Sequence, residues 1–168
     1  MKRKLKKYIV SLSPKQIDFD FSAGRNRYTI TLDKKNEMKE YCSKHKISLP
    51  VLFEAATTLY SARINNADDV TLCSLVLNRS GMKEKSTMGM YNNIVPMTTV
   101  VDWNNTFVNL CDEISKEHFQ VFRHQRYPFN NIMNLIRERY GQSSVYDIMI
   151  SYQNAEVKSM PLITWHVL

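Results

Sequence analysis

The spacing of apolar and polar positions predicts a chain of strands and helices. Residues 27–32 alternate polar and apolar side chains, with Tyr28, Ile30 and Leu32 on one side, and a period of two is typical of a half-buried strand. Residues 70–77 are apolar or small at nearly every position, which favours a strand covered on both faces. Both segments are therefore predicted to be strands of a sheet.

Two further segments are predicted to be extended. Residues 94–101 form a mostly apolar run that contains Pro96. Because proline has no N–H to donate to a neighbouring strand, this strand must bend or lie at an edge of the sheet. Residues 145–152 are predicted to be the closing strand, and residues 78–87 are predicted to be a loop.

Apolar residues at helical spacing predict two helices in the first half of the chain. Asp33 is expected to cap the first helix, which runs to about His45. Ser48 is expected to open the second, since Pro50 is tolerated in a first turn. The second helix is apolar on most sides, which indicates a central position.

Two more helices are predicted in the second half. Asn104, Asn105 or Thr106 caps the third, and the fourth begins at Pro128 and stops at Gly141. The predicted order is strand, helix, helix, strand, strand, helix, helix, strand. This order predicts an α/β fold in which a mixed sheet is packed with helices.

Composition narrows the class of protein. The chain has 168 residues, 43% of them hydrophobic and 23% charged, which suits one globular domain. No apolar run approaches the ~20 residues that span a membrane, and the apolar part of the N-terminal segment is too short for a signal peptide. A cytoplasmic location is therefore expected.

The cysteines and the charge point to no special chemistry. Cys42, Cys73 and Cys111 are dispersed within apolar patterns, so we expect buried thiols rather than disulfides or a zinc site. The formal net charge is +7, but Lys2, Arg3, Lys4, Lys6 and Lys7 carry five of these charges at the start of the chain. Nucleic-acid binding by this basic arm is the weaker interpretation, and a solvated terminus is favoured.

A self-contained active site is not evident from the residues alone. The four histidines have no metal-ligand spacing, no serine lies in a GxSxG turn, and the four glycines are too far apart to cradle a phosphate. A Ser-His-Asp arrangement formed in three dimensions stays open at this point. Neither a metal site nor a bound cofactor is predicted.

Several segments nevertheless follow one another in a specific order. They are residues 68–70 (DDV), 78–79 (NR), 88–96 (MGMYNNIVP), 124–129 (HQRYPF) and 146–154 (YDIMISYQN). The chain resembles the condensation domains of nonribosomal peptide synthetases, whose motifs in the same order are DDV, (G/N)R, IGxFVNTLPLR, HQxxPF and FDVMFSLQN. Cys73, Thr98 and Arg126 depart from the usual residues of this pattern.

The resemblance implies one lobe of a larger fold. Such domains have a chloramphenicol acetyltransferase-like fold of two α/β lobes around a tunnel, and residues 27–168 match the C-terminal lobe, after a basic lead-in over residues 1–26. On this expectation the chain stops before the last strand and helix of the family. The family's catalytic histidine lies in an HHxxxDG motif of the other lobe, and this chain contains no His-His pair.

The resemblance also suggests roles for residues. Those expected on the side of the tunnel are Arg79, Gly89, Asn93 and Pro96, and those expected to be structural are Asp69, His124, Gln125, Pro128, Phe129, Asp147, Gln153 and Asn154. Asn93 either orients substrate or satisfies backbone groups at the end of a strand. Arg79 either pairs with an acidic residue of the other lobe or is solvated. Asp147 needs a partner if it is buried.

The function implied is amide formation between carrier-bound aminoacyl or acyl thioesters and an acceptor amine. The isolated chain is expected to be inactive, because the HHxxxDG lobe is absent from it. Expected partners are that lobe, carrier proteins bearing phosphopantetheine, an adenylation domain and, through the uncovered lobe surface, a second copy of the chain. The alternatives are a fragment of a stand-alone acyltransferase of the same superfamily and a small basic nucleic-acid-binding or adaptor domain.

Overall fold

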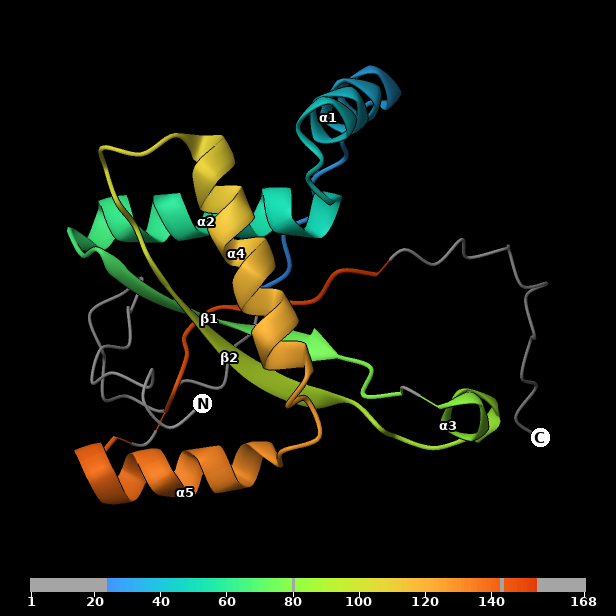
Figure 1. The fold of residues 1–168 in the computed structure, drawn as a ribbon, viewed down its shortest axis with the longest axis vertical. Coiled ribbons are helices and arrows are strands. Elements are labelled where there is room, and N and C mark those ends of the chain that lie inside the picture. The colour runs from blue at the N-terminus through green and yellow to red at the C-terminus, as the bar shows by residue number, and fades with distance from the viewer. Residues whose placement is uncertain (1–23, 80, 143, 154–168) are drawn as a thin grey trace.

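The computed structural model describes residues 24–79, 81–142 and 144–153 (Figure 1). Helices and strands follow one another in the mixed order expected for an α/β fold. In chain order they are α1 (Leu32–His45), α2 (Leu49–Asn65), β1 (Asp69–Val76), α3 (Met82–Ser86), β2 (Asn93–Val100), α4 (Phe107–Phe122), α5 (Phe129–Tyr140) and β3 (Met149–Ile150).

The described strands form one mixed sheet with the order β2-β1-β3. β1 and β2 are antiparallel and pair along their whole length, from Asp69 opposite Val100 to Val76 opposite Asn93. β3 runs parallel to β1. Among the described strands β2 has a neighbour on one side only, so Pro96 lies in an edge strand, as its missing N–H requires.

One face of this sheet carries the apolar side chains that meet α2 and α4. Val70 and Leu72 of β1 pack against Ala62 of α2. Further along the sheet, Val76 packs with Val121 of α4. Because side chains alternate along a strand, these β1 residues point to the same side. Figure 1 shows α4 crossing α2 and continuing over the sheet, and α5 at the opposite end of the molecule from α1.

Helix α4 also closes a second apolar cluster with α1 and α2. Ile114, with 1% of its surface exposed, is at the centre of the α4 side, beside Cys111. Ala55 of α2 and Cys42 of α1 complete the contact. Removing a side chain as large as that of Ile114 from water stabilises the fold by about 1.5–3 kcal/mol. The helices are therefore attached both to one another and to the sheet.

Most predicted helix ends agree with the structure, and one differs. Ser48 is the N-cap of α2, and Thr106 caps α4 by accepting a hydrogen bond from the Asn109 N–H. Gly141 ends α5 in the left-handed conformation. The prediction of Asp33 as the cap of α1 is wrong, because the hydroxyl of Thr31 accepts from the N–H of Lys34 and the helix begins earlier.

Two strand predictions need correction. Residues 24–31 form no strand, and Tyr28 is 87% exposed. An alternating segment becomes a strand only where a neighbour supplies hydrogen bonds and a core to cover its apolar side, and no described strand pairs with it. The strand expected over 145–152 is reduced to Met149–Ile150, and the loop expected over 78–87 contains α3.

A buried polar pair joins α2 to α4. Oε2 of Glu54, a residue that is 3% exposed, lies 2.7 Å from Nε2 of His118 and forms a hydrogen bond with it. A carboxyl group placed away from water needs such a partner, since an unpaired one is costly. The sequence shows that Glu54 is a charged residue within an apolar helix, but it does not show that His118 is its partner.

The cysteines are buried thiols, as expected from their apolar surroundings. Burial raises the pKa of Cys73 to about 12 and that of Cys111 to about 11. The pKa of Cys42 is raised by the same cause.

Among the described residues, no helix has both the length and the apolar character of a membrane span.

We therefore expect all three thiols to resist a thiol reagent in the folded chain. Thiolate is the reactive form, and a pKa near 12 leaves only about one thiol in 10⁴ ionised at pH 8. The check is the rate of reaction with 5,5′-dithiobis(2-nitrobenzoate) at pH 8, with the chain in urea as the reference for full exposure. Rapid native reaction of one thiol or more would contradict the burial described here.

Candidate functional site

The side chain of Arg79 bonds to several points of the loop between β1 and β2. Its Nη1 donates to the carbonyl oxygens of Glu84 and Thr87, the latter at 2.6 Å. Its Nη2 donates to the carbonyl oxygen of Gly89 at 2.6 Å. The guanidinium also lies over the ring of Tyr91, with its central carbon 4.3 Å from the ring centroid. Arg79 therefore fixes the path of the chain from α3 to the start of β2.

Gly89 has a backbone conformation that suits glycine. Its φ is 149°, a value that side-chain-bearing residues rarely adopt. A Cβ at this position would also come within 3.4 Å of the ring of Tyr91. Gly89 thus allows its carbonyl and the Tyr91 ring to reach the same guanidinium.

Asn93, the first residue of β2, joins two segments that are distant in the sequence. Its Nδ2 donates to the carbonyl oxygen of Gln125 at 2.7 Å and to that of Tyr127 at 2.8 Å. Both acceptors belong to the turn between α4 and α5. One amide group thereby binds the beginning of β2 to the turn that aims α5.

A second contact ties the same turn to α3. Oε1 of Glu84 lies 2.7 Å from Nη2 of Arg126, while Oε2 accepts from the N–H of Gly81 at the start of α3. The side chain of Arg126 is 65% exposed, so this ion pair contributes little to stability. Its effect is to orient α3. We call Arg79, Glu84, Gly89, Asn93 and residues 125–127 the motif corner.

The other predicted residues lie around this corner or apart from it. Pro96 is buried in β2, and Asp69 begins β1. His124 is exposed and its backbone N–H donates to the carbonyl of Val121, which shapes the turn. These residues form part of the scaffold on which the motif corner is built.

The remaining predicted residues lie at the start of α5 and in the last motif, residues 146–154. Pro128 is the N-cap of α5, and the ring of Phe129 packs 6.0 Å from that of Tyr146. Asp147 and Gln153 are exposed, so the Asp147 carboxylate has solvent around it and needs no buried partner. Asn154 lies outside the described residues, as does the basic segment that holds Lys2 to Lys7.

The chemistry available at the motif corner is binding and positioning. It offers guanidinium groups, an amide and backbone carbonyls, and its carboxylate already bonds to Arg126. In the described part of the chain no three His, Cys, Asp or Glu side chains come together as metal ligands. The sequence suggested the motifs separately, but the hydrogen bonds of Asn93 that unite them depend on the fold.

Replacing Asn93 with alanine is expected to destabilise the chain by about 1–3 kcal/mol, since two carbonyls lose their donor. Asn93→Asp should be at least as harmful, because a carboxylate would face those two acceptors. The exposed neighbour Asn92 provides the matched control, and Asn92→Ala should stay within about 0.5 kcal/mol of wild type. Urea unfolding followed by circular dichroism measures both, and equal midpoints for the two alanine variants would contradict the role of Asn93.

Comparison with known proteins identifies the family to which the chain belongs. The family model described as "Condensation domain" matches residues 5–163. A plipastatin synthase chain of Bacillus subtilis (strain 168) is 29% identical over 133 residues, which are 79% of this chain and 5% of that protein. Surfactin synthase subunit 1 of the same organism is 27% identical over 70% of this chain and 3% of its own length. The chain thus spans a small part of these relatives.

Solved structures agree on the fold. The first condensation domain of the CDA synthetase superposes with a TM-score of 0.62 at 18% identity, over 68% of this chain and 26% of that one. A four-domain nonribosomal peptide synthetase, AB3403, superposes with a TM-score of 0.64 at 12% identity, over 73% and 9% of the two chains. With a mixed α/β fold shared with these structures and a family model that covers nearly its whole length, the chain belongs to the condensation-domain family.

Proposed function

We propose that this chain provides the C-terminal lobe of a condensation domain whose parent enzyme forms amide bonds. In that reaction an acceptor amine attacks a thioester donor, and both substrates are carried by phosphopantetheine on carrier proteins. The observation that carries the proposal is the motif corner. Its Asn93 joins the segment 88–96 to the turn at 124–129, and both segments resemble condensation-domain motifs.

In this proposal the chain shapes one wall of the reaction tunnel and leaves proton transfer to another lobe. In the motif corner the guanidinium group of Arg79 fixes the loop between β1 and β2. The amide group of Asn93 fixes the turn between α4 and α5. The proposed base is the second histidine of an HHxxxDG motif, and no such motif occurs in the 168 residues. A positioned base typically contributes about 10²–10⁴ to a rate. The role proposed for Arg79 and Asn93 is accordingly to hold the wall in place.

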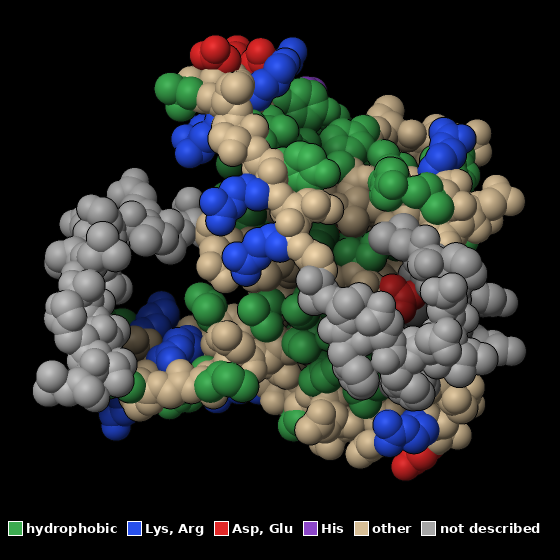
Figure 2. Space-filling view, turned by 180° about the vertical axis from the view of Figure 1, so that it is seen from behind, with side chains coloured by type: hydrophobic (Ala, Val, Ile, Leu, Met, Phe, Trp, Pro, Cys, Tyr) green, Lys and Arg blue, Asp and Glu red, His purple; other side chains and the backbone are tan. Residues whose placement is uncertain are grey.

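The surface proposed to meet the other lobe is the outer side of the loop that Arg79 holds. Met82, Met88 and Met90 are 82%, 97% and 92% exposed there. Figure 2 shows hydrophobic and basic side chains together on the projecting segment that contains α3. The flexible, unbranched side chain of methionine adapts to irregular surfaces. A loop that carries exposed methionines and is fixed by Arg79 therefore suits a contact between lobes.

The surroundings of the parent enzyme are also part of the proposal. A carrier protein and an adenylation domain would belong to the same assembly, as members of a peptide-synthesising chain. AB3403, one of the structures that share this fold, is described as a four-domain nonribosomal peptide synthetase bound to AMP and glycine. This likeness supports a multidomain context for the present chain.

The purified chain alone is expected to form no amide from an aminoacyl-carrier donor and an aminoacyl-carrier acceptor. Amide should appear when a separately expressed N-terminal lobe with HHxxxDG, taken from a condensation domain of the plipastatin synthase relative, is added. Mass spectrometry of the carrier-bound product gives the yield. The matched control is the same lobe with its second motif histidine changed to alanine. Amide made by the chain alone above a boiled control would refute the division of labour between lobes.

Because its lobe-facing surface is uncovered, the chain alone is expected to associate with itself at high concentration. Static light scattering over a dilution series measures the mass. Changing Met88 and Met90 together to aspartate should shift the mass toward that of a monomer, while Glu138→Gln on α5 should not. A wild-type chain that stays monomeric at the highest concentration would count against this surface.

A further inference from the structure

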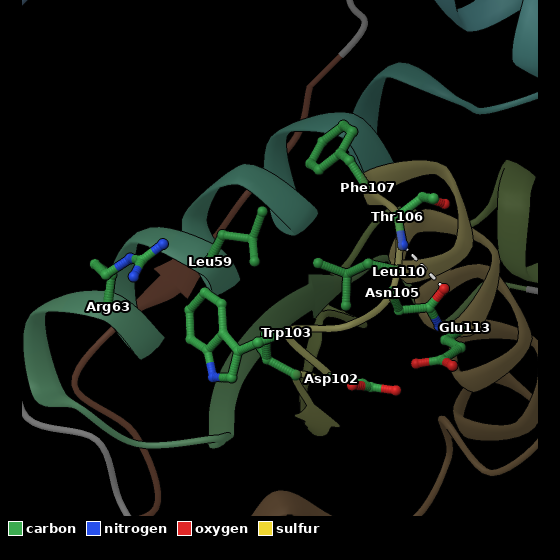
Figure 3. Close-up of a pocket in the computed structure, with 10 residues that line it drawn as sticks. Leu59, Arg63, Asp102, Trp103, Asn105, Thr106, Phe107, Leu110 and Glu113 are labelled. Carbon is green, nitrogen blue, oxygen red and sulfur yellow. Dashed lines mark hydrogen bonds between the residues drawn. The ribbon is translucent and has the colours of Figure 1, made fainter.

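A pocket that lies apart from the motif corner is formed by α2, α4 and the segment between β2 and α4 (Figure 3). Its cavity volume is about 240 Å³. Leu59, Trp103 and Leu110 provide apolar walls, and Figure 3 shows the three side chains directed toward a common space. A space of this size suits a ligand much smaller than a cofactor.

Charged side chains of opposite sign border this pocket at two places. Arg63 lies on one side of the Trp103 ring, and the carboxylates of Asp102 and Glu113 lie on the other (Figure 3). All three charged residues are exposed, so their heads meet solvent at the mouth of the pocket. A ligand that complements this arrangement carries a negative group at one end, a positive group at the other and an apolar part between them.

The aromatic wall is held in position before any ligand arrives. The indole N–H of Trp103 donates to Oδ1 of Asp68 at 2.7 Å. The guanidinium carbon of Arg63 lies 4.6 Å from the centroid of the ring. These two contacts fix the plane of the indole and keep Arg63 at the pocket. A preorganised wall reduces the entropy that a ligand loses on binding.

We propose that this pocket binds a short apolar peptide with free termini. The peptide's carboxylate pairs with Arg63, its ammonium group pairs with Asp102 and Glu113, and an apolar side chain packs on Trp103. A single amino acid carries its two charges on adjacent groups, whereas a dipeptide separates them along its backbone. The assignment depends on the charges and walls of the pocket and not on the tunnel function proposed for the motif corner.

The test is titration of the full-length chain with alanyl-leucine, followed by the fluorescence of Trp103 in a Trp165→Phe background that leaves Trp103 as the single tryptophan. Saturable binding with a dissociation constant of about 1 mM is expected for a ligand of this size. N-acetyl-alanyl-leucine lacks the ammonium group and alanyl-leucinamide lacks the carboxylate. Each should bind about two- to fivefold more weakly, as the loss of one exposed ion pair predicts.

Variants of the pocket test which side chain binds each end of the peptide. Glu113→Gln should weaken alanyl-leucine but leave the N-acetylated peptide unchanged, and Arg63→Gln should weaken alanyl-leucine but leave the amide unchanged. Glu138→Gln and Arg139→Gln, exposed on α5, are the matched controls and should change nothing. Circular dichroism confirms that each variant is folded. The proposal is overturned if Trp103 shows no saturable response, or if both blocked peptides bind as tightly as the free one.

Discussion

Two hydrogen bonds from one amide tie the start of strand β2 to the turn that precedes helix α5. Asn93 begins the edge strand β2, and its Nδ2 binds two carbonyls of the turn between α4 and α5. A side chain with two N–H donors can satisfy both carbonyls at once, which hydroxyl or carboxylate groups cannot do in the same way. The direction of α5 relative to the sheet therefore depends on a contact between residues more than thirty positions apart.

Around this contact the structure divides into a part with a packed apolar core and a loop that is held by hydrogen bonds. The sheet, α2 and α4 share apolar clusters and the buried Glu54–His118 pair, and they supply the hydrophobic stabilisation. The loop with α3 has little apolar burial, since its methionines face solvent. It keeps its shape because Arg79 binds three of its carbonyls. Polar contacts thus determine the shape of the loop, which lies outside the apolar core.

This division fits a wall that another lobe completes. A tunnel wall must present fixed backbone groups while its outer surface stays available for contact, and the hydrogen bonds of Arg79 and Asn93 fix the backbone carbonyls of the motif corner. In the proposed function, proton transfer then belongs to a histidine of the other lobe.

Local rules were sufficient for much of the fold. The central strand β1, the edge position of Pro96, the Ser48 cap and the stop at Gly141 follow from residue type and spacing. The segments similar to family motifs were also visible, because each is a short run of residues in a fixed order. These features depend on the nearest few positions along the chain, where steric limits and hydrogen-bonding capacity act directly.

Only the tertiary structure decided the rest. The alternation at 27–32 is the pattern of a strand, yet these residues are exposed, because strand formation needs a neighbour that no local pattern can reveal. The partners of Arg79, Asn93, Glu54 and Trp103 are likewise set by segments that meet only after folding. The sequence by itself determined the two long strands, the four long helices and the family, because these depend on residue type, spacing and order along the chain. The packing of distant segments determined whether residues 27–32 form a strand and which polar groups bind one another.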